Sequence, residues 1–375
     1  MSILDADYAV LECAMPGFVA AVQNCPFADR EGADSPLLGL FKAHGGVDMA
    51  IPKSHGGKGL SAPALVRAQR ALGALSPSLA IAINMHQFSV ATLVEMAKAS
   101  SGVEWMLLQA IAEGQLLVAS AFAEGAAGAS ILEPFLEAQP LGSNFRISGS
   151  KKPCSLARSM ELITLSIRVP SADGSKLAVA LIPADTPGIE VRKFWNSPIL
   201  AAAESEEVVF DNVLVHEKMI SYSGSRDELD QVQLAGFIWF ELLLTASYLG
   251  IGSRLLEKLL EAPRATSPDL VFVASRLTCS TQALLQLATE FEQAPPDQQS
   301  DLLGRILLTR YTTQDLLDAA AARAVEGMGG LRFVMDPEVA YLLAASKALA
   351  FHPPSRVSMH DYLARWLRGA PLVLC

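Results

Sequence analysis

The sequence predicts a mostly helical protein with a small β domain at its centre. Residues 1–115 and 226–375 carry apolar side chains at helical spacing, interrupted by short loops. Residues 116–225 instead contain short apolar runs with β-branched residues, separated by Gly, Pro, Asn and Asp, which is typical of a compact antiparallel β unit. Small-molecule sites favour junctions between such units, so we expect the functional site where the β domain meets the helices.

Bulk composition narrows the class of protein. Hydrophobic residues make up 51% of the 375, which fits a globular chain with a large core and argues against disorder. Acidic residues follow the first few positions, so we expect neither a secretory signal nor a transit peptide, and we expect no uninterrupted apolar run long enough to span a bilayer. Five scattered cysteines without CxxC spacing indicate reduced thiols in the cytoplasm and no metal site. The net charge of −10 disfavours nucleic-acid binding.

The first helical domain, residues 1–115, contains two features of interest. The segment Ile51–Ser61 is rich in glycine but matches neither a phosphate-binding loop nor a dinucleotide fingerprint, so a structural turn is the better interpretation. The segment Leu75–Ala97 predicts a strongly apolar helix that carries His86. A lone histidine on an apolar face is more often a core residue with a satisfied hydrogen bond than a ligand contact, and substrate binding by His86 is the minority hypothesis.

The second helical domain, residues 226–375, is built around one very apolar helix. The segment Gly236–Glu261 is apolar around nearly its whole circumference and should be a central, buried helix. Three further helices are expected at Leu270–Glu292, Asp297–Gly327 and Pro337–Ala350.

Several motifs in this order resemble the acyl-CoA dehydrogenase superfamily of flavoproteins. These are IPKSHGGKGLS (51–61), AFAEGAAGAS (121–130), GSKKPCS (149–155), VVFDNVLV (208–215) and EGMGG (326–330). The resemblance implies an acyl-CoA dehydrogenase-like fold of α-bundle, β-barrel and four-helix bundle, with FAD as cofactor. It also implies a homodimer or homotetramer and a thioester substrate lying between the flavin and the long central helix.

Flavin contacts are implied residue by residue. A turn rich in Gly, Ala and Ser lets backbone N–H groups approach a ligand closely, although such a turn alone would be an ordinary hairpin loop. The resemblance assigns flavin contact in the β domain to Phe122, Ala123, Gly128, Ala129, Pro153 and Ser155. It assigns flavin contact across a subunit interface to Glu326, Gly329 and Gly330, and near the last helix to Ser355. Ala123 lacks the hydroxyl that the family usually has there, and Pro153 replaces its stacking tryptophan, so we expect a flavin pocket that is rebuilt relative to the family.

The catalytic base of ordinary family members is missing. Dehydrogenases remove an α-proton with a glutamate, and the loop position for it is Pro353 here. The alternative position on the central helix aligns with Phe240, a candidate substrate contact, and Glu241 comes one residue later. One residue turns a helical side chain by roughly 100°, so Glu241 is not automatically equivalent. A catalytic role and a structural ion pair with Arg356 are equally open for it.

The neighbouring loop offers the remaining catalytic candidates. His352 is a candidate proton acceptor, and Arg356 is a candidate anchor for a carboxylate or carbonyl group, although the HPPSR sequence could equally be a rigid turn. Without an α-base, oxidation of an alcohol or aldehyde hydrate is easier than desaturation of an acyl chain. The resemblance therefore points to the branch that acts on carrier-protein-bound units, such as the conversion of seryl-carrier protein toward an aminomalonyl unit.

We therefore expect an FAD-dependent oxidoreductase that acts on a phosphopantetheine-bound thioester of an acyl carrier protein, with an unknown electron acceptor and no nucleic-acid or membrane partner. An acidic enzyme needs a local basic patch to bind an acidic carrier. Lys151, Lys152 and Arg158, or Arg365 and Arg368, are candidates, and solvated surface charge is the simpler interpretation. The alternatives are an ordinary acyl-CoA dehydrogenase, a flavin hydroxylase and a non-catalytic partner subunit.

Overall fold

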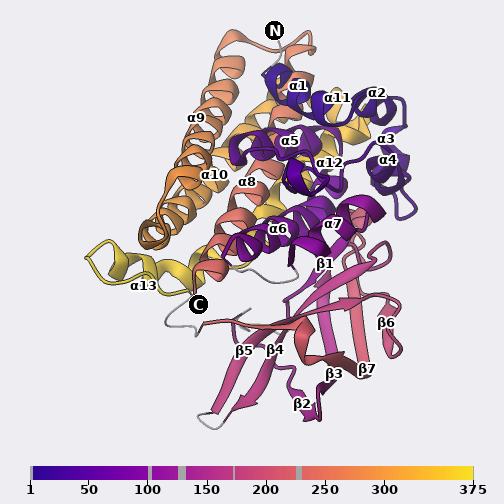
Figure 1. Cartoon of the computed structure of the whole chain (residues 1–375). Coiled ribbons are helices and arrows are strands. Elements are labelled where there is room, and N and C mark those ends of the chain that lie inside the picture. Colours follow the sequence, from indigo (N-terminus) through magenta and orange to yellow (C-terminus); the bar gives the residue numbers. More distant parts are fainter. Residues whose placement is uncertain (1–2, 100–103, 126–131, 172–173, 225–229, 375) are drawn as a thin grey trace.

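A computed structural model gives the arrangement of residues 3–99, 104–125, 132–171, 174–224 and 230–374. Helices form one side of the molecule and two small sheets form the other (Figure 1). The expectation of a mostly helical chain with a central β segment is confirmed.

Helices fill the N-terminal segment up to Gly114. The Ser61 side chain is the N-cap of α5, because its hydroxyl accepts a hydrogen bond from the backbone N–H of Ala64. The next helix, α6, begins with a proline at residue 77, a residue that suits the first position of a helix. The helices are α1 (Asp5–Ala14), α2 (Phe18–Gln23), α3 (Phe27–Glu31), α4 (Leu37–Ala43), α5 (Ala62–Leu75), α6 (Pro77–Ala99) and α7 (Glu104–Gly114), with a short 3₁₀ helix η1 (Lys53–His55).

The strands pair as two four-stranded sheets, ordered β1-β4-β5-β8 and β2-β3-β7-β6. The strands are β1 (Val118–Ala121), β2 (Ala138–Leu141), β3 (Asn144–Cys154), β4 (Leu162–Ser171), β5 (Gly174–Pro183), β6 (Ile189–Arg192), β7 (Glu206–His216) and β8 (Ile220–Tyr222), with η2 (Ala201–Ala203) and η3 (Glu217–Met219) between strands. The expectation of a purely antiparallel unit is wrong in one place, because β1 runs parallel to β4. The barrel itself stays a prediction.

The C-terminal segment is a bundle around α8 (Gln231–Leu260), which is buried along most of its length, as the sequence predicts. Reciprocal side-chain caps start both long helices, with Asp230 and Gln233 at α8 and Thr266 and Asp269 at α9. The other elements are α9 (Ser267–Gln293), η4 (Pro296–Gln298), α10 (Gln299–Met328), α11 (Gly330–Met335), α12 (Pro337–Ser346), η5 (Lys347–Phe351) and α13 (Arg356–Trp366).

Two glycines let α5 and α8 cross with their backbones almost in contact. A Cβ atom on Gly73 would lie 2.0 Å from the carbonyl oxygen of Ser247, and one on Gly250 would lie 2.1 Å from that of Arg70. Any side chain at either position would push the helices apart. This crossing fixes α8 against the N-terminal helices and therefore fixes one wall of the site described below.

Three helices, α6, α8 and α9, are long and apolar enough to cross a membrane by length and composition. The expectation that no apolar run reaches that length is therefore wrong. Inside this fold, 67% of the most apolar window of α6 and 78% of that of α8 are buried, against 39% for α9. The apolar surface of α6 and α8 is thus used in the protein core.

One buried carboxylate joins all three parts of the chain. Glu31 in α3 accepts hydrogen bonds from Ser76 and Ser78 at the α5–α6 junction and, at 2.6 Å, from the Tyr341 hydroxyl of α12. The Tyr341 oxygen in turn accepts the backbone N–H of Leu200 in the β domain at 2.8 Å. Burial raises the pKa of Glu31.

Candidate functional site

The two segments expected to contact a flavin lie side by side. Phe122 and Ala123 directly follow β1, and the Ala123 carbonyl accepts the backbone N–H of Lys152 at 3.0 Å. Gly125 adopts a φ of +67°, and a Cβ atom there would lie 2.4 Å from the Lys152 side chain. The loop after β1 is therefore packed directly against the end of β3. Gly128 and Ala129 lie outside the described residues.

A buried ion pair links these two segments on the side that faces the protein interior. The Lys151 ammonium, which has no exposed surface, donates to the Glu124 carboxylate and to the Ser166 hydroxyl at 3.0 Å. The same carboxylate accepts the backbone N–H of Phe135 at 3.0 Å. Because both charges are buried and paired, the pair fixes the position of the loop relative to β3.

The surface in front of this ion pair suits a flat, polar-edged ring. The Pro153 ring is exposed, and the half-buried Ser155 hydroxyl lies 2.9 Å from that of Ser205. An apolar ring, a hydroxyl and the exposed Gly125 fit an isoalloxazine, with its hydrophobic face and its hydrogen-bonding edge. Flavin contact by these residues stays a prediction that their arrangement supports.

The loop before α13 is held by Arg310 of α10, a residue that the sequence reasoning missed. Its guanidinium donates to the backbone carbonyls of His352 at 2.6 Å, Leu349 at 3.3 Å and Pro353 at 3.4 Å. The Tyr311 hydroxyl adds a hydrogen bond of 2.9 Å to the carbonyl of Pro354. The position at which dehydrogenases of the family carry their glutamate is thus fixed from the protein interior.

Glu241 is the partner of this arginine. Its two carboxylate oxygens accept from Arg310 Nη1 at 2.8 and 2.9 Å, and the side chain has no exposed surface. The ion-pair hypothesis for Glu241 thus applies, but with Arg310, not Arg356, as the partner. A proton acceptor must reach the substrate, so this arrangement favours the structural role. The catalytic role stays untested.

His352 belongs to the loop that Arg310 holds before α13, and its imidazole ring is neutral. Its Nε2 atom is 2.8 Å from the Tyr248 hydroxyl of α8, and the two rings meet edge to face at 5.6 Å. Burial lowers the pKa of His352 to about 3, and the nearby Arg310 charge acts in the same direction. Burial also raises the pKa of Tyr248, which therefore stays protonated. Together they form an uncharged hydrogen-bonding pair.

The two remaining candidates on this loop have other partners. Arg356 forms an ion pair with Asp315, at 2.7 and 2.8 Å, and is not in contact with Glu241. The Ser355 hydroxyl accepts the backbone N–H of Ser358 at 3.1 Å and so caps the start of α13. Anchoring of substrate by Arg356 and flavin contact by Ser355 stay predictions.

His86 is a fully satisfied core residue. Its Nε2 hydrogen-bonds the carbonyl of Val47 at 2.8 Å, and its Nδ1 accepts the backbone N–H of Val118 at 3.1 Å. Burial lowers its pKa to about 4. His86 therefore joins α6 to β1, and the core interpretation accounts for both ring nitrogens. Phe240, in contrast, is half-buried and meets Phe88 of α6 edge to face at 5.3 Å.

The EGMGG segment lies far from the same chain's clamped loop. Glu326 is exposed and follows Arg310 by 16 residues, which is about 24 Å along α10. Gly329, with a φ of +84°, ends α10, and the exposed Gly330 begins α11. A contact between this segment and a flavin of another subunit, as the resemblance implies, stays a prediction.

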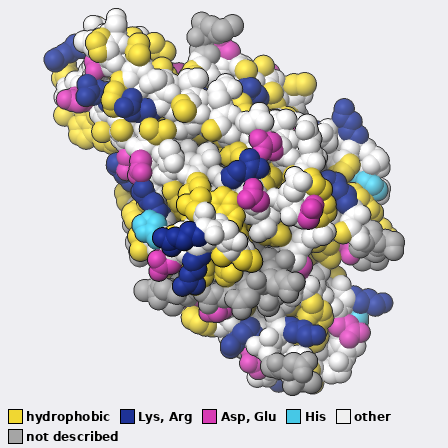
Figure 2. All heavy atoms as spheres, turned by 90° about the vertical axis from the view of Figure 1, so that its left-hand side faces the viewer, with side chains coloured by type: hydrophobic (Ala, Val, Ile, Leu, Met, Phe, Trp, Pro, Cys, Tyr) yellow, Lys and Arg dark blue, Asp and Glu magenta, His cyan; other side chains and the backbone are white. Residues whose placement is uncertain are grey.

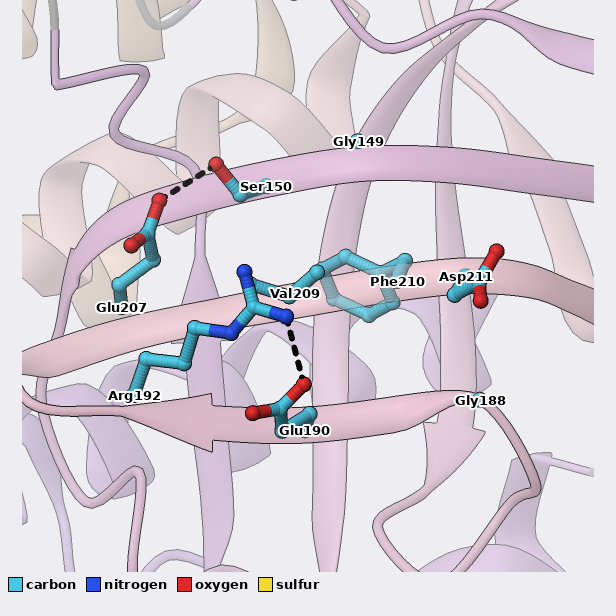
Figure 3. A pocket seen from close by; sticks show the side chains of 9 residues that line it. All are labelled: Gly149, Ser150, Gly188, Glu190, Arg192, Glu207, Val209, Phe210 and Asp211. Atoms are coloured by element: carbon cyan, nitrogen blue, oxygen red, sulfur yellow. Dashed lines mark hydrogen bonds and ion pairs between the residues drawn. The ribbon is translucent and has the colours of Figure 1, made fainter.

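A separate groove of about 380 Å³ lies on the outer face of β3, β7 and β6 (Figure 3). Its charged side chains already have partners. Arg192 pairs with Glu190 at 2.7 Å, Glu207 pairs with Lys152 at 2.9 Å, and Asp211 accepts from the Asn212 amide at 2.7 Å. The groove shares Gly149 and Ser150 with the 149–155 segment, and none of its lining residues belongs to the loop before α13.

The first expected basic patch is wrong at Lys151, and a role of its other two residues in carrier binding stays a prediction. Lys151 is buried, and Lys152 pairs with Glu207 at 2.9 Å. Arg158 lies 3.7 Å from Glu204 and from Glu206. Arg365 and Arg368 are exposed at the end of α13, and Figure 2 shows basic, acidic and apolar side chains sharing one face of the molecule.

Comparisons with known proteins agree with these observations. A scan against protein-family models finds no match. The isobutylamine N-hydroxylase of Streptomyces viridifaciens is 39% identical over 379 residues, covering 99% of this chain and 100% of that protein. The L-prolyl-[peptidyl-carrier protein] dehydrogenase of Pseudomonas fluorescens is 23% identical and covers 86% of this chain and 87% of that protein.

Solved structures support the same fold. The nitrososynthase of Micromonospora carbonacea var. africana superposes with a TM-score of 0.85 at 21% identity, covering 99% of this chain and 98% of that one. The FMN-bound TdsC of Paenibacillus sp. A11-2 superposes with a TM-score of 0.83 at 18% identity, with the same coverage. The full-length superpositions show that both chains share one architecture with this one.

Proposed function

Because the chain belongs to the acyl-CoA dehydrogenase-like flavoprotein superfamily and is a flavin-dependent enzyme, we propose that it is a monooxygenase that hydroxylates the nitrogen of a small primary amine. The relative that matches it over its full length at 39% identity carries the name isobutylamine N-hydroxylase, which favours oxygen transfer over dehydrogenation. The hydroxylase alternative from the sequence thus takes precedence over the carrier-bound dehydrogenase.

The observation that carries this proposal is the lack of an available carboxylate where a dehydrogenase needs one. The segment 347–355 contains no acidic residue, and both oxygens of Glu241 are bound by Arg310. N-hydroxylation needs no base at carbon, because the lone pair of the substrate nitrogen forms the new bond. The segment 347–355 also offers no carboxylate that would stabilise an ammonium, which favours binding of the amine as the reactive free base.

The reaction balances with one amine and one O₂ consumed. A reduced flavin, when bound, would supply the two electrons needed for one oxygen atom of O₂ to go to the amine nitrogen and the other to leave as water. The nitrogen then loses a proton to give the neutral hydroxylamine. We assign to the His352 imidazole, whose ring is oriented by Tyr248, the relay of this proton to solvent water, because its low pKa keeps the ring from holding the proton itself.

The test is a single-turnover experiment with isobutylamine. The protein is mixed under nitrogen with dithionite-reduced FAD or FMN and then with buffer containing ¹⁸O₂. We expect a hydroxylamine that contains ¹⁸O, and a strong loss of this product in His352→Gln but not in the matched surface control His360→Gln. Amine that loses two hydrogens without gaining oxygen would overturn the proposal.

Dehydrogenation of a carrier-bound unit is the second candidate, and the prolyl-carrier dehydrogenase relative favours it. It requires an acyl carrier protein with a phosphopantetheine arm. Bleaching of the oxidised flavin under nitrogen by prolyl- or seryl-carrier protein, without O₂, would favour it. A flavin colour unchanged by these substrates would exclude it.

We also propose that the protein is a homodimer or homotetramer. The short helix next to the EGMGG segment exposes Leu331, Val334 and Met335, with exposed fractions of 79%, 74% and 71%. Apolar side chains this exposed beside a segment that resembles a subunit-interface motif support self-association. Size-exclusion chromatography with light scattering measures it, and Val334→Glu should shift the protein toward monomer.

A further inference from the structure

Asn84 of α6 is a buried amide without a protein partner. It has no exposed surface, and neither its Nδ2 nor its Oδ1 atom forms a hydrogen bond. Among the buried amide side chains in the part of the chain that the structure describes, it is the one with neither its nitrogen nor its oxygen bonded. A buried polar group without a partner is destabilising, so its presence in a well-packed helix calls for an explanation.

Neighbouring polar side chains on the same helix each form at least one hydrogen bond, although Gln87 Oε1 has no partner. His86 uses both ring nitrogens, and Gln87 donates from Nε2 to the carbonyl of Gly46 at 3.1 Å. Ser89 and Thr92 each donate to a backbone carbonyl one turn earlier, at 2.8 and 2.7 Å. The orphaned amide of Asn84 is therefore not a general feature of this helix.

Asn84 belongs to the side of α6 that faces α8. Phe88 follows it by one helical turn, so the two side chains lie on the same side of the helix. Phe88 in turn meets Phe240 of α8, and both rings are half-buried. On α8, Leu243 and Leu244 are fully buried in the next turn after Phe240. The amide thus lies next to aromatic and aliphatic surface, with a partly open aromatic pair one turn away.

We infer that Asn84 is the polar anchor for the amino group of a small aliphatic amine bound between α6 and α8. The inference rests on the proposed function and names the residue that recognises the substrate. The amide oxygen accepts one N–H of the neutral amine, which leaves the nitrogen lone pair free to react. An amide suits this role better than a carboxylate, which would stabilise the ammonium form and so block the lone pair. The apolar neighbours suit a short alkyl chain.

The decisive variant is Asn84→Leu, with Gln69→Leu as its matched control. Gln69 is also a buried amide, but its Nε2 atom donates to the carbonyl of Ala80 at 2.6 Å and to Ser247 Oγ at 2.9 Å. Loss of an unpartnered amide should leave the melting temperature equal or higher, whereas loss of a bonded one should lower it. We expect Asn84→Leu to raise the KM for isobutylamine by at least tenfold while its Kd for flavin changes by less than twofold.

Two results would overturn the inference. A KM within twofold of wild type would show that Asn84 does not contact the amine, and a drop in melting temperature like that of Gln69→Leu would show a structural partner. If Asn84→Leu does not fold, Asn84→Ala answers the same question. Titration of isobutylamine into the flavin-loaded protein, followed by flavin absorbance, measures binding even if no hydroxylamine forms. Binding that depends on Asn84 without hydroxylation would reject the proposed function and keep the anchor.

Discussion

The Glu241–Arg310 pair makes a quantitative prediction about stability. Glu241→Leu leaves the buried Arg310 charge with only the carbonyls of Leu349, His352 and Pro353, and breaking a buried pair costs about 3–5 kcal/mol. Arg310→Met should cost more, because it leaves a buried carboxylate without a partner and also releases three carbonyls. The double variant removes both charges, so its loss should be smaller than the sum of the single losses by about 2–4 kcal/mol.

Urea denaturation of the four proteins, followed by circular dichroism, measures this cycle. Product formation by Glu241→Leu, assayed well below its melting temperature, separates the structural role from catalysis, and we expect a loss of less than tenfold. Strictly additive stability losses would show that the two charges do not interact. Near-complete loss of product with wild-type stability would instead make Glu241 a catalytic residue.

Three further predictions follow from the site. His86 has a pKa of about 4 in the folded protein, below its ordinary value of 6.5. Its contribution to stability is therefore full above pH 6.5 and is lost as the pH falls toward 4. Chemical denaturation of His86→Gln should show a free energy of unfolding that depends less on pH than wild type, by about 1 kcal/mol per pH unit in this window. Lys151→Met should weaken flavin binding about tenfold and lower the free energy of unfolding by about 3 kcal/mol, and adding Glu124→Leu should partly restore both. Fluorescence titration measures the flavin affinity and urea denaturation measures the stability. Unchanged flavin affinity would contradict the role of this ion pair. Because His352 is neutral above about pH 4, kcat/KM for an aliphatic amine should rise about tenfold per unit between pH 6 and 9 as the free base becomes available; a flat profile would argue against binding of the neutral amine.

The sequence predicts the helices well because their signals are local. Apolar periodicity and capping residues place α8 and α9 to within a few residues at most ends. The parallel pairing of β1 with β4 has no such signal, since it joins strands more than 40 residues apart. Strand alternation likewise separates Lys151 from Lys152. One ammonium points into the protein and the other to its surface, although the charges look equivalent along the chain.

The site was predicted less completely than the fold for the same reason. Glu241 and Arg310 are 69 residues apart, and no local pattern connects them. One signal was available, because Arg310 falls on the buried face of α10 with Leu303, Ile306 and Leu317, where an arginine needs a buried partner. The unbonded amide of Asn84 depends on what surrounds it in three dimensions, so it could only be found in the structure.

The hydrogen bonds that connect Glu31, Tyr341 and Leu200 have a consequence for protein engineering. Chimaeras that exchange the β domain or the last helices with those of a relative would separate Glu31, Leu200 and Tyr341, which come from three different segments. A swapped domain that brings Phe in place of Tyr341 would leave an ionisable side chain and a backbone N–H facing each other across a gap. Shuffling experiments should therefore move these three positions together, as a single inherited unit.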